Sequence, residues 1–205
     1  MAFEFFVKSD ILFGCGFVKK LPEVLAEYNA IKVMLVYDSG VKIAGIADKV
    51  MECLKDAKAE IVIFDKVEEA AQIARDKKVD TFVAVGGGSS IDLAKAINVL
   101  MTNPGTIVQY GGIGMVKNDL LPLIAIPTTA GTSSEITNVS ALIDTEKVIK
   151  YVVIDNKLVP SKVIIDPEFT KTMPASVTAA TGMDAITHAV ESYISNMASP
   201  LSEYN

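Results

Sequence analysis

Five short runs of consecutive apolar residues, separated by stretches with helical spacing, constrain the fold of this chain more than any other feature. None of them alternates with polar residues, which is typical of strands buried on both faces of a parallel sheet. The runs are Val33–Tyr37, Ile61–Phe64, Thr81–Val85, Leu121–Ile126 and Val163–Ile165. This alternation of strand and helix predicts an α/β fold, a Rossmann-like parallel sheet with helices on both faces.

The third apolar run leads directly into three glycines, Gly86–Gly88, here called the glycine loop, and then into an amphipathic helix. Residues without a Cβ let the backbone approach a bulky anion, and the helix start directs unpaired N–H groups and its positive dipole end at the same point. The pattern predicts a cradle for a nucleotide pyrophosphate. Ser89 and Asp92 also have the spacing of a capping box, which needs no ligand.

Asp38 follows the first apolar run and is expected at the same edge of the sheet as the glycine loop. An acidic residue at such a strand end commonly accepts hydrogen bonds from a ribose and repels a 2′-phosphate, which favours NAD over NADP. An aspartate beside Ser39 and Gly40 is equally consistent with a simple turn.

Small hydroxyl residues dominate the segment Pro127–Glu135, here called the hydroxyl loop, which follows the fourth apolar run. Thr128, Thr129 and Thr132 are candidates to donate hydrogen bonds to a cofactor beside the glycine loop. A polar loop that caps a helix near Ser133 or Ser134 is the alternative interpretation.

Two alternating segments, Val139–Ile143 and Tyr151–Ile154, predict a β-ribbon whose turn is Asp144–Lys147. Lys150 lies on or near this ribbon. A lysine there is most often solvated, whereas one that faces the glycine loop would bind a phosphate or a ribose.

The character of the chain changes after Asp166, where the strands stop and an alanine-rich helical stretch, Pro174–Ser195, follows. We expect a nucleotide-binding α/β domain over 1–172 and the first helices of a truncated helical domain over 173–205. Asp184 and His188 are four residues apart, so they share one helix face at about 5–6 Å between Cβ atoms and are able to chelate one divalent metal ion. A hydrogen bond within the helix is the alternative.

Composition excludes several classes of function. Half of the 205 residues are apolar and the net charge is −6, which argues against nucleic-acid and anionic-membrane surfaces and favours a small-molecule ligand. The two cysteines, Cys15 and Cys53, are widely spaced and lack metal-ligand spacing, as in a reduced cytoplasmic protein. The N-terminus does not have the pattern of a signal peptide, and no segment is long enough to span a bilayer.

Four motifs occur together in the order and spacing of one family: Gly86–Asp92, Pro127–Glu135, Asp166–Pro167 and Thr181–Glu191. In these motifs the chain resembles the iron-containing (group III) alcohol dehydrogenases, in particular the branch of 1,3-propanediol dehydrogenases and lactaldehyde reductases. The resemblance covers the N-terminal half of a typical member. It implies hydride transfer between NAD(H) and a small alcohol or aldehyde, with iron, or alternatively zinc, as the metal cofactor.

The resemblance also assigns roles to individual residues. Asp38 would select NAD, and Asp184 and His188 would be the first two metal ligands. The pyrophosphate and the rest of the dinucleotide would contact Gly87, Gly88, Ser89, Ser90, Thr128, Thr129, Thr132 and Lys150. His188 is the only histidine, and two later histidines of the family pattern are missing from this sequence.

Other expectations accompany these roles. A catalytically inactive nucleotide-binding module, and a relative of glycerol dehydrogenase or dehydroquinate synthase, are the alternative functions. The family implies a homo-oligomer, a dimer or larger, and Phe3, Phe5 and Phe6 are candidates to pair with a neighbouring chain. The family pattern carries a longer loop than the short junction between Phe64 and Glu68.

Overall fold

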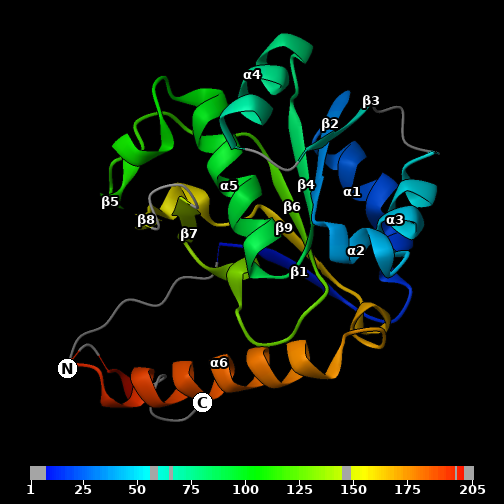
Figure 1. The fold of residues 1–205 in the computed structure, drawn as a ribbon. Coiled ribbons are helices and arrows are strands. Elements are labelled where there is room, and N and C mark those ends of the chain that lie inside the picture. Colours follow the sequence, from blue (N-terminus) through cyan, green and yellow to red (C-terminus); the bar gives the residue numbers. More distant parts are fainter. Residues whose placement is uncertain (1–7, 56–59, 65–66, 145–148, 197, 201–205) are drawn as a thin grey trace.

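The computed structural model describes residues 8–55, 60–64, 67–144, 149–196 and 198–200, with side chains left out for 60–64 and 144. Its main feature is a six-stranded sheet in which every pair of neighbouring strands is parallel (Figure 1). In spatial order the strands are β1 Asp10–Phe13, β9 Lys162–Ile165, β6 Leu123–Pro127, β4 Thr81–Gly86, β2 Lys32–Tyr37 and β3 Glu60–Phe64.

The order of the strands places a topological switch point between β2 and β4. From β2 the chain moves outward to β3 and then returns to the other side of β2 to form β4, after which β6 and β9 continue in that direction. In open parallel sheets of this kind, ligands bind at the carboxyl ends of the strands beside the switch point. Asp38 and the glycine loop follow these two strands.

Helices cover both faces of the sheet (Figure 1). One buried cluster packs β-sheet residues against α4 and α5, and a second packs the opposite side chains against α1, α2 and α3. The alternation of Met34 and Phe82 on one face with Leu35 and Val83 on the other explains why these strands lack polar positions. The helices are α1 Leu21–Glu27, α2 Ser39–Ile43, α3 Ile46–Leu54, α4 Val67–Lys77 and α5 Gly88–Thr102.

A second, three-stranded sheet packs beside α5. Its strands are β5 Gly112–Ile113, β7 Val139–Asp144 and β8 Ile149–Ile154, and β7 pairs with β8 in antiparallel fashion as predicted for the ribbon. Short 3₁₀ turns connect the elements: η1 Phe17–Lys20, η2 Ile107–Tyr110, η3 Ser134–Ile136, η4 Asn156–Leu158 and η5 Pro167–Thr170.

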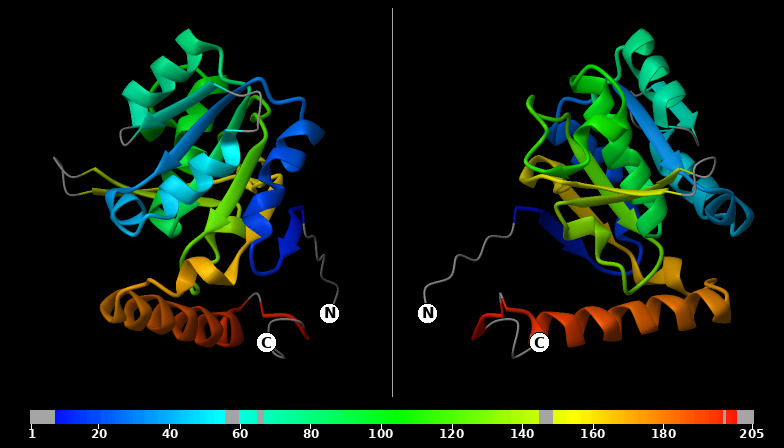
Figure 2. Two further views of the ribbon diagram at one scale, coloured as in Figure 1. Left: turned by 90° about the vertical axis from the view of Figure 1, so that its right-hand side faces the viewer. Right: turned by 60° about the vertical axis from the view of Figure 1, so that its left-hand side comes forward.

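The helix α6, Ala175–Ile194, lies along the outside of the α/β body in every view (Figures 1 and 2). None of its residues is buried. It begins the helical part of the chain, as expected from the alanine-rich sequence.

The structure corrects several details of the sequence interpretation. β6 begins at Leu123 rather than Leu121, because Pro122 has no N–H to donate to a neighbouring strand. The sequence analysis did not predict β1, an edge strand of four mostly exposed residues whose apolar run is only Ile11–Phe13. The predicted pairing of Phe3, Phe5 and Phe6, most of the ribbon turn and the junction before Val67 lie outside the described residues.

Candidate functional site

Three loops meet at the carboxyl edge of the sheet and line one pocket of about 590 Å³. They follow the adjacent strands β2, β4 and β6 and contribute Asp38, the glycine loop and the hydroxyl loop. The outer wall comes from α2 and from the segment that leads into α6. The predicted residues that line the pocket are Asp38, Gly87, Gly88, Ser89, Thr128, Thr129 and Thr132.

The glycine loop brings the start of α5 to the pocket floor. Gly87 is the N-cap of α5. The first-turn amides of any helix lack an intrahelical acceptor, and here no capping side chain accepts from them either. The capping-box interpretation of Ser89 and Asp92 is therefore wrong. The two loops also approach each other closely: a Cβ on Gly88 would lie 3.1 Å from side-chain atoms of Thr132.

Asp38 is both a helix cap and a pocket residue. Its Oδ1 accepts a hydrogen bond from the Val41 amide (2.9 Å), which makes it the N-cap of α2, and its Oδ2 accepts one from the Ser90 hydroxyl (2.6 Å). The side chain is exposed toward the pocket. Asp38 thus begins a helix and also lines the pocket. The hydrogen bonds expected from it to a ribose stay a prediction.

Ser90 does not lie on the pocket wall as the sequence interpretation expected. Only 2% of it is exposed, and its hydroxyl is directed at Asp38. Ser90 occupies the third position of α5, which turns its side chain inward beneath the glycine loop toward β2. Its contact with the pocket is indirect, through Asp38.

Lys150 also differs from expectation. It lies on β8 in the three-stranded sheet, is exposed, and is not among the residues that line this pocket. The ribbon packs beside α5 and not at the switch point, so Lys150 is solvated, as lysines on such ribbons usually are.

The hydroxyl loop is fixed to α5 by a buried pair that the sequence analysis missed. Lys95 is fully buried, and its Nζ donates to the carbonyl oxygens of Ser134 (2.7 Å), Thr137 (3.0 Å) and Val139 (2.6 Å). Asp92, whose Oδ1 is 3.5 Å from this Nζ, accepts hydrogen bonds from the Ser134 hydroxyl and from a backbone amide of β7. Burial lowers the pKa of Lys95 to about 8, and Asp92 partly offsets this shift. The loop ends in a 3₁₀ turn, η3, not in an α-helix.

Asp184 and His188 share one exposed face of α6. The Asp184 Oδ1 and His188 Nε2 atoms are 3.8 Å apart, which is longer than a hydrogen bond, so the alternative of a direct intrahelical bond is not formed. The side chains are 43% and 52% exposed respectively.

Comparison with known proteins identifies the family. The model of the iron-containing alcohol dehydrogenase family matches residues 8–167. This chain is a member of the iron-containing alcohol dehydrogenases. The NAD-dependent methanol dehydrogenase of Bacillus methanolicus is 36% identical, and the 1,3-propanediol dehydrogenase of Klebsiella pneumoniae is 38% identical; each alignment covers 98% of this chain and 55% of the relative. The chain therefore spans about half the length of these curated relatives.

Solved iron-containing alcohol dehydrogenase relatives have the same fold. A crystal structure of 1,3-propanediol oxidoreductase superposes with a TM-score of 0.90 at 38% identity, over 98% of this chain and 55% of that one. Sulfoacetaldehyde reductase from Bifidobacterium kashiwanohense, solved in complex with NAD⁺, superposes with a TM-score of 0.89 at 29% identity, over 100% of this chain and 56% of that one.

The described residues do not supply a complete set of ligands for a metal ion such as the family name implies. Within the described ranges, no group of three or more histidine, cysteine or acidic side chains converges as a metal site requires. Asp184 and His188 provide two donors, whereas catalytic zinc and iron sites have three or more protein ligands. A complete metal site thus needs donors beyond this pair. The same described part of the chain has no helix with the length and apolarity to cross a bilayer.

Proposed function

We propose that this chain carries the NAD-binding domain, residues 1–172, of an oxidoreductase that transfers hydride between NAD(H) and a small alcohol or aldehyde. The observation that carries the proposal is the pocket at the β2–β4 switch point, where three loops meet the start of α5. Its size is in the ordinary range for small-molecule sites. The activities for which the relatives are named, and the NAD⁺ complex of one of them, support the same cofactor.

Different residues around the pocket bind different parts of the dinucleotide. The first-turn amides of α5, at Gly88 and Ser89, bind the pyrophosphate, since they combine unpaired donors with the positive helix end. Asp38 accepts hydrogen bonds from the adenosine ribose and repels a 2′-phosphate. The hydroxyls of Thr128, Thr129 and Thr132 donate to the remaining polar groups and hold the dinucleotide against the opposite, more apolar wall.

That apolar wall suits a flat base. It is formed by Val41 and Ile43 from α2, by Ala44 directly after it, and by Phe169, Met173 and Pro174 from the segment before α6. These side chains exclude water from one side of the pocket, which strengthens the polar contacts made on the other side.

We propose that Asp184 and His188 belong to the metal site of the complete enzyme, for iron or alternatively zinc, in the helical domain that starts at 173. A bound ion of this kind supplies Lewis-acid polarisation of the substrate oxygen. The two residues lie on one helix face and so reach a common point. The remaining donors come from outside the described residues, so we derive no reaction step from this pair.

The proposed enzyme is a cytoplasmic homo-oligomer, a dimer or larger. Two observations support this: the cysteine pattern fits a reducing compartment, and the edge strand β1 exposes Ile11 and Phe13. Sedimentation velocity measures the oligomeric state.

Titration of this chain with NADH and NADPH, followed by nucleotide fluorescence, tests the proposal. We expect NADH to bind about tenfold or more tightly than NADPH, because Asp38 repels the added phosphate. Asp38→Ala should reduce this preference. Asp155→Ala, which removes the N-cap of η4 outside the pocket, should leave it unchanged. Equal binding of both nucleotides, or binding of neither, would contradict the assignment.

A nucleotide-binding module without catalysis is the second candidate function; in the part of the chain that the structure describes, no three metal-binding side chains converge. A turnover assay with propanediol and Fe²⁺ alongside the titration tests whether this chain has activity by itself. Turnover would exclude the module without catalysis, whereas binding without turnover is expected of both functions.

A further inference from the structure

A buried lysine, Lys95, lies on α5 and contacts the hydroxyl loop at Ser134, yet it does not line the nucleotide pocket. It is in the second turn of α5, the same helix whose start forms the pyrophosphate cradle. Three carbonyl groups from 134 to 139 accept hydrogen bonds from its Nζ at 2.6–3.0 Å. An ammonium has three N–H donors, so these carbonyls match its full donor capacity.

The path from Lys95 to the pocket is short. The Ser134 carbonyl accepts from Lys95, and the Ser134 amide donates to the Thr132 hydroxyl at 3.4 Å. Thr132 lines the pocket and approaches Gly88 of the glycine loop. The Ser134 backbone thus connects Lys95 on α5 to Thr132, and Thr132 lies against the glycine loop.

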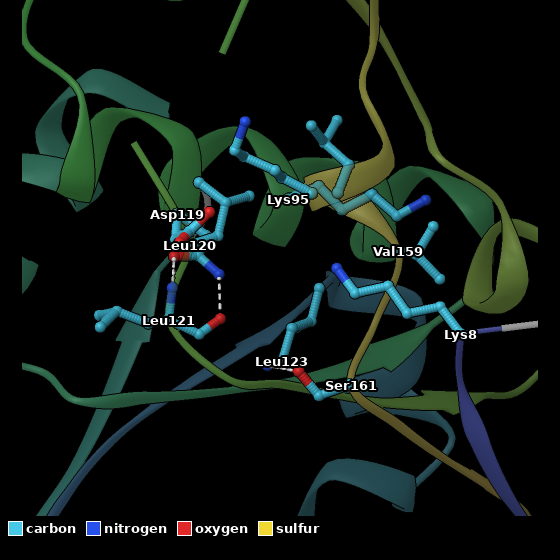
Figure 3. A pocket seen from close by; sticks show the side chains of 11 residues that line it. Lys8, Lys95, Asp119, Leu120, Leu121, Leu123, Val159 and Ser161 are labelled. Carbon is cyan, nitrogen blue, oxygen red and sulfur yellow. Dashed lines mark hydrogen bonds between the residues drawn. The ribbon is translucent and has the colours of Figure 1, made fainter. Parts of the chain in front are cut away.

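Lys95 is fully buried, and nearby carboxylates balance its positive charge. Asp92 on the same helix and Glu135 on η3 are the carboxylates that act on it, and burial raises the pKa of Glu135. The Lys95 side chain also borders a separate pocket of about 100 Å³, which Lys8, Asp119 and Lys157 line as well (Figure 3). Beside it, Asn98 and Leu121 exchange two hydrogen bonds that fix α5 to the segment just before β6.

We propose that Lys95 is a positioning residue for nucleotide binding: it holds the hydroxyl loop against the glycine loop and thereby sets the affinity of the pocket for NADH. The inference rests on the proposed NAD-binding function. It assigns no contact between Lys95 and the nucleotide, because the amine is directed away from the pocket, into the backbone of the segment from Ser134 to Val139.

The first test is the variant Lys95→Met, compared with Lys162→Met. Lys162 in β9 is also buried and ion-paired, with Asp10 and Glu27, but it lies outside the nucleotide pocket. We expect Lys95→Met to weaken NADH binding by about tenfold or more, since the loop carbonyls lose their donor, and Lys162→Met to change it by less than about twofold. Where Lys95→Met fails to fold, Asp92→Asn loosens the same junction more gently and should weaken binding in the same direction.

A double-mutant cycle separates positioning from general destabilisation. Thr132→Val removes the hydroxyl through which Lys95 acts on the pocket. If Lys95 positions that hydroxyl, the Lys95→Met penalty in NADH affinity should be clearly smaller in the Thr132→Val background than in the wild type. Equal penalties in the two backgrounds would overturn the inference.

The pH profile of binding is a second readout that a purely structural role would not move. Because the pKa of Lys95 is lowered to about 8, the amine loses its charge and one N–H donor as the pH rises through that value. Wild-type NADH affinity should therefore fall above about pH 8, and this step should be absent in Lys95→Met. Wild-type protein that fails to bind NADH refutes the proposed function, whereas normal binding by Lys95→Met refutes only the role of Lys95.

Discussion

At the scale of single residues, the hydrogen bond from Ser90 to Asp38 joins the two sides of the switch point. Ser90 belongs to α5, whereas Asp38 follows β2, so their 2.6 Å contact fixes the carboxylate that faces the pocket. We predict that Ser90→Ala lowers the NADH-over-NADPH preference by a few fold, because the carboxylate is then free to rotate away from the ribose. The unfolding free energy should fall by about 1 kcal/mol, the usual value of one hydrogen bond.

The matched control for this prediction is Ser9→Ala. Ser9 is also buried, and its hydroxyl donates to the Pro160 carbonyl at 2.8 Å, outside the nucleotide pocket. It should lose similar stability without any change in nucleotide preference. Paired titrations and thermal melts of both variants make the comparison, and an unchanged preference in Ser90→Ala would show that Asp38 is oriented by the α2 cap alone.

At the scale of elements, the hydroxyl loop also contacts the helical part of the chain. Gly131 has a φ of +152°, and a Cβ placed there would lie 2.1 Å from the Thr181 carbonyl oxygen of α6. We predict that Gly131→Ala displaces α6 and destabilises the protein by about 1–3 kcal/mol, through backbone strain and the steric clash together. NADH binding should weaken too, because Thr181 and Val177 of α6 form part of the pocket wall.

A neighbouring glycine provides the control. Gly182 lies within α6 itself, and a Cβ added there would meet no atom of another element within 4 Å. Gly182→Ala should leave binding unchanged and stabilise the helix by up to about 1 kcal/mol, since alanine loses less entropy on folding. Thermal unfolding and NADH titration of both variants test the pair. Equal behaviour would show that the Gly131 contact with α6 is unimportant.

The sequence predicted those elements that a short run of neighbouring residues is enough to identify. The strands β2, β4, β6 and β9 are buried and have continuous apolar runs. The residues that follow β2, β4 and β6 therefore identified the polar side of the pocket, whereas its apolar wall was not predicted. Ser90 and Lys150 do not line the pocket, because helix phase and sheet membership decide where their side chains point. Their expected contacts with the dinucleotide stay predictions. Lys95 was missed because a lysine on a helix is usually solvated, although its position one turn after Ile91 and three residues before Asn98, both buried, marks it as facing the core.

At the scale of the whole molecule, the protein divides into a well-packed α/β body and a helix with no buried residue. α5 has nine buried residues, whereas α6 has none and exposes an apolar series at Met183, Ile186, Val190, Tyr193 and Ile194. The spacing of these residues is that of one helix face, which ordinarily packs against another element.

This division predicts how the chain opens. Local unfolding free energy depends on buried contacts, so the amides of α6 should exchange hydrogen far faster than those of α5, whose slowest amides should exchange only through global unfolding. Hydrogen exchange followed by mass spectrometry on the 205-residue chain measures both helices at once. NADH should slow exchange at the α6 start, around Val177 and Thr181, and leave the segment after His188 unchanged, because only the start lines the pocket. Protection of α6 equal to that of α5 at every protein concentration would contradict the prediction, whereas protection that rises with concentration would show a second copy covering the apolar face.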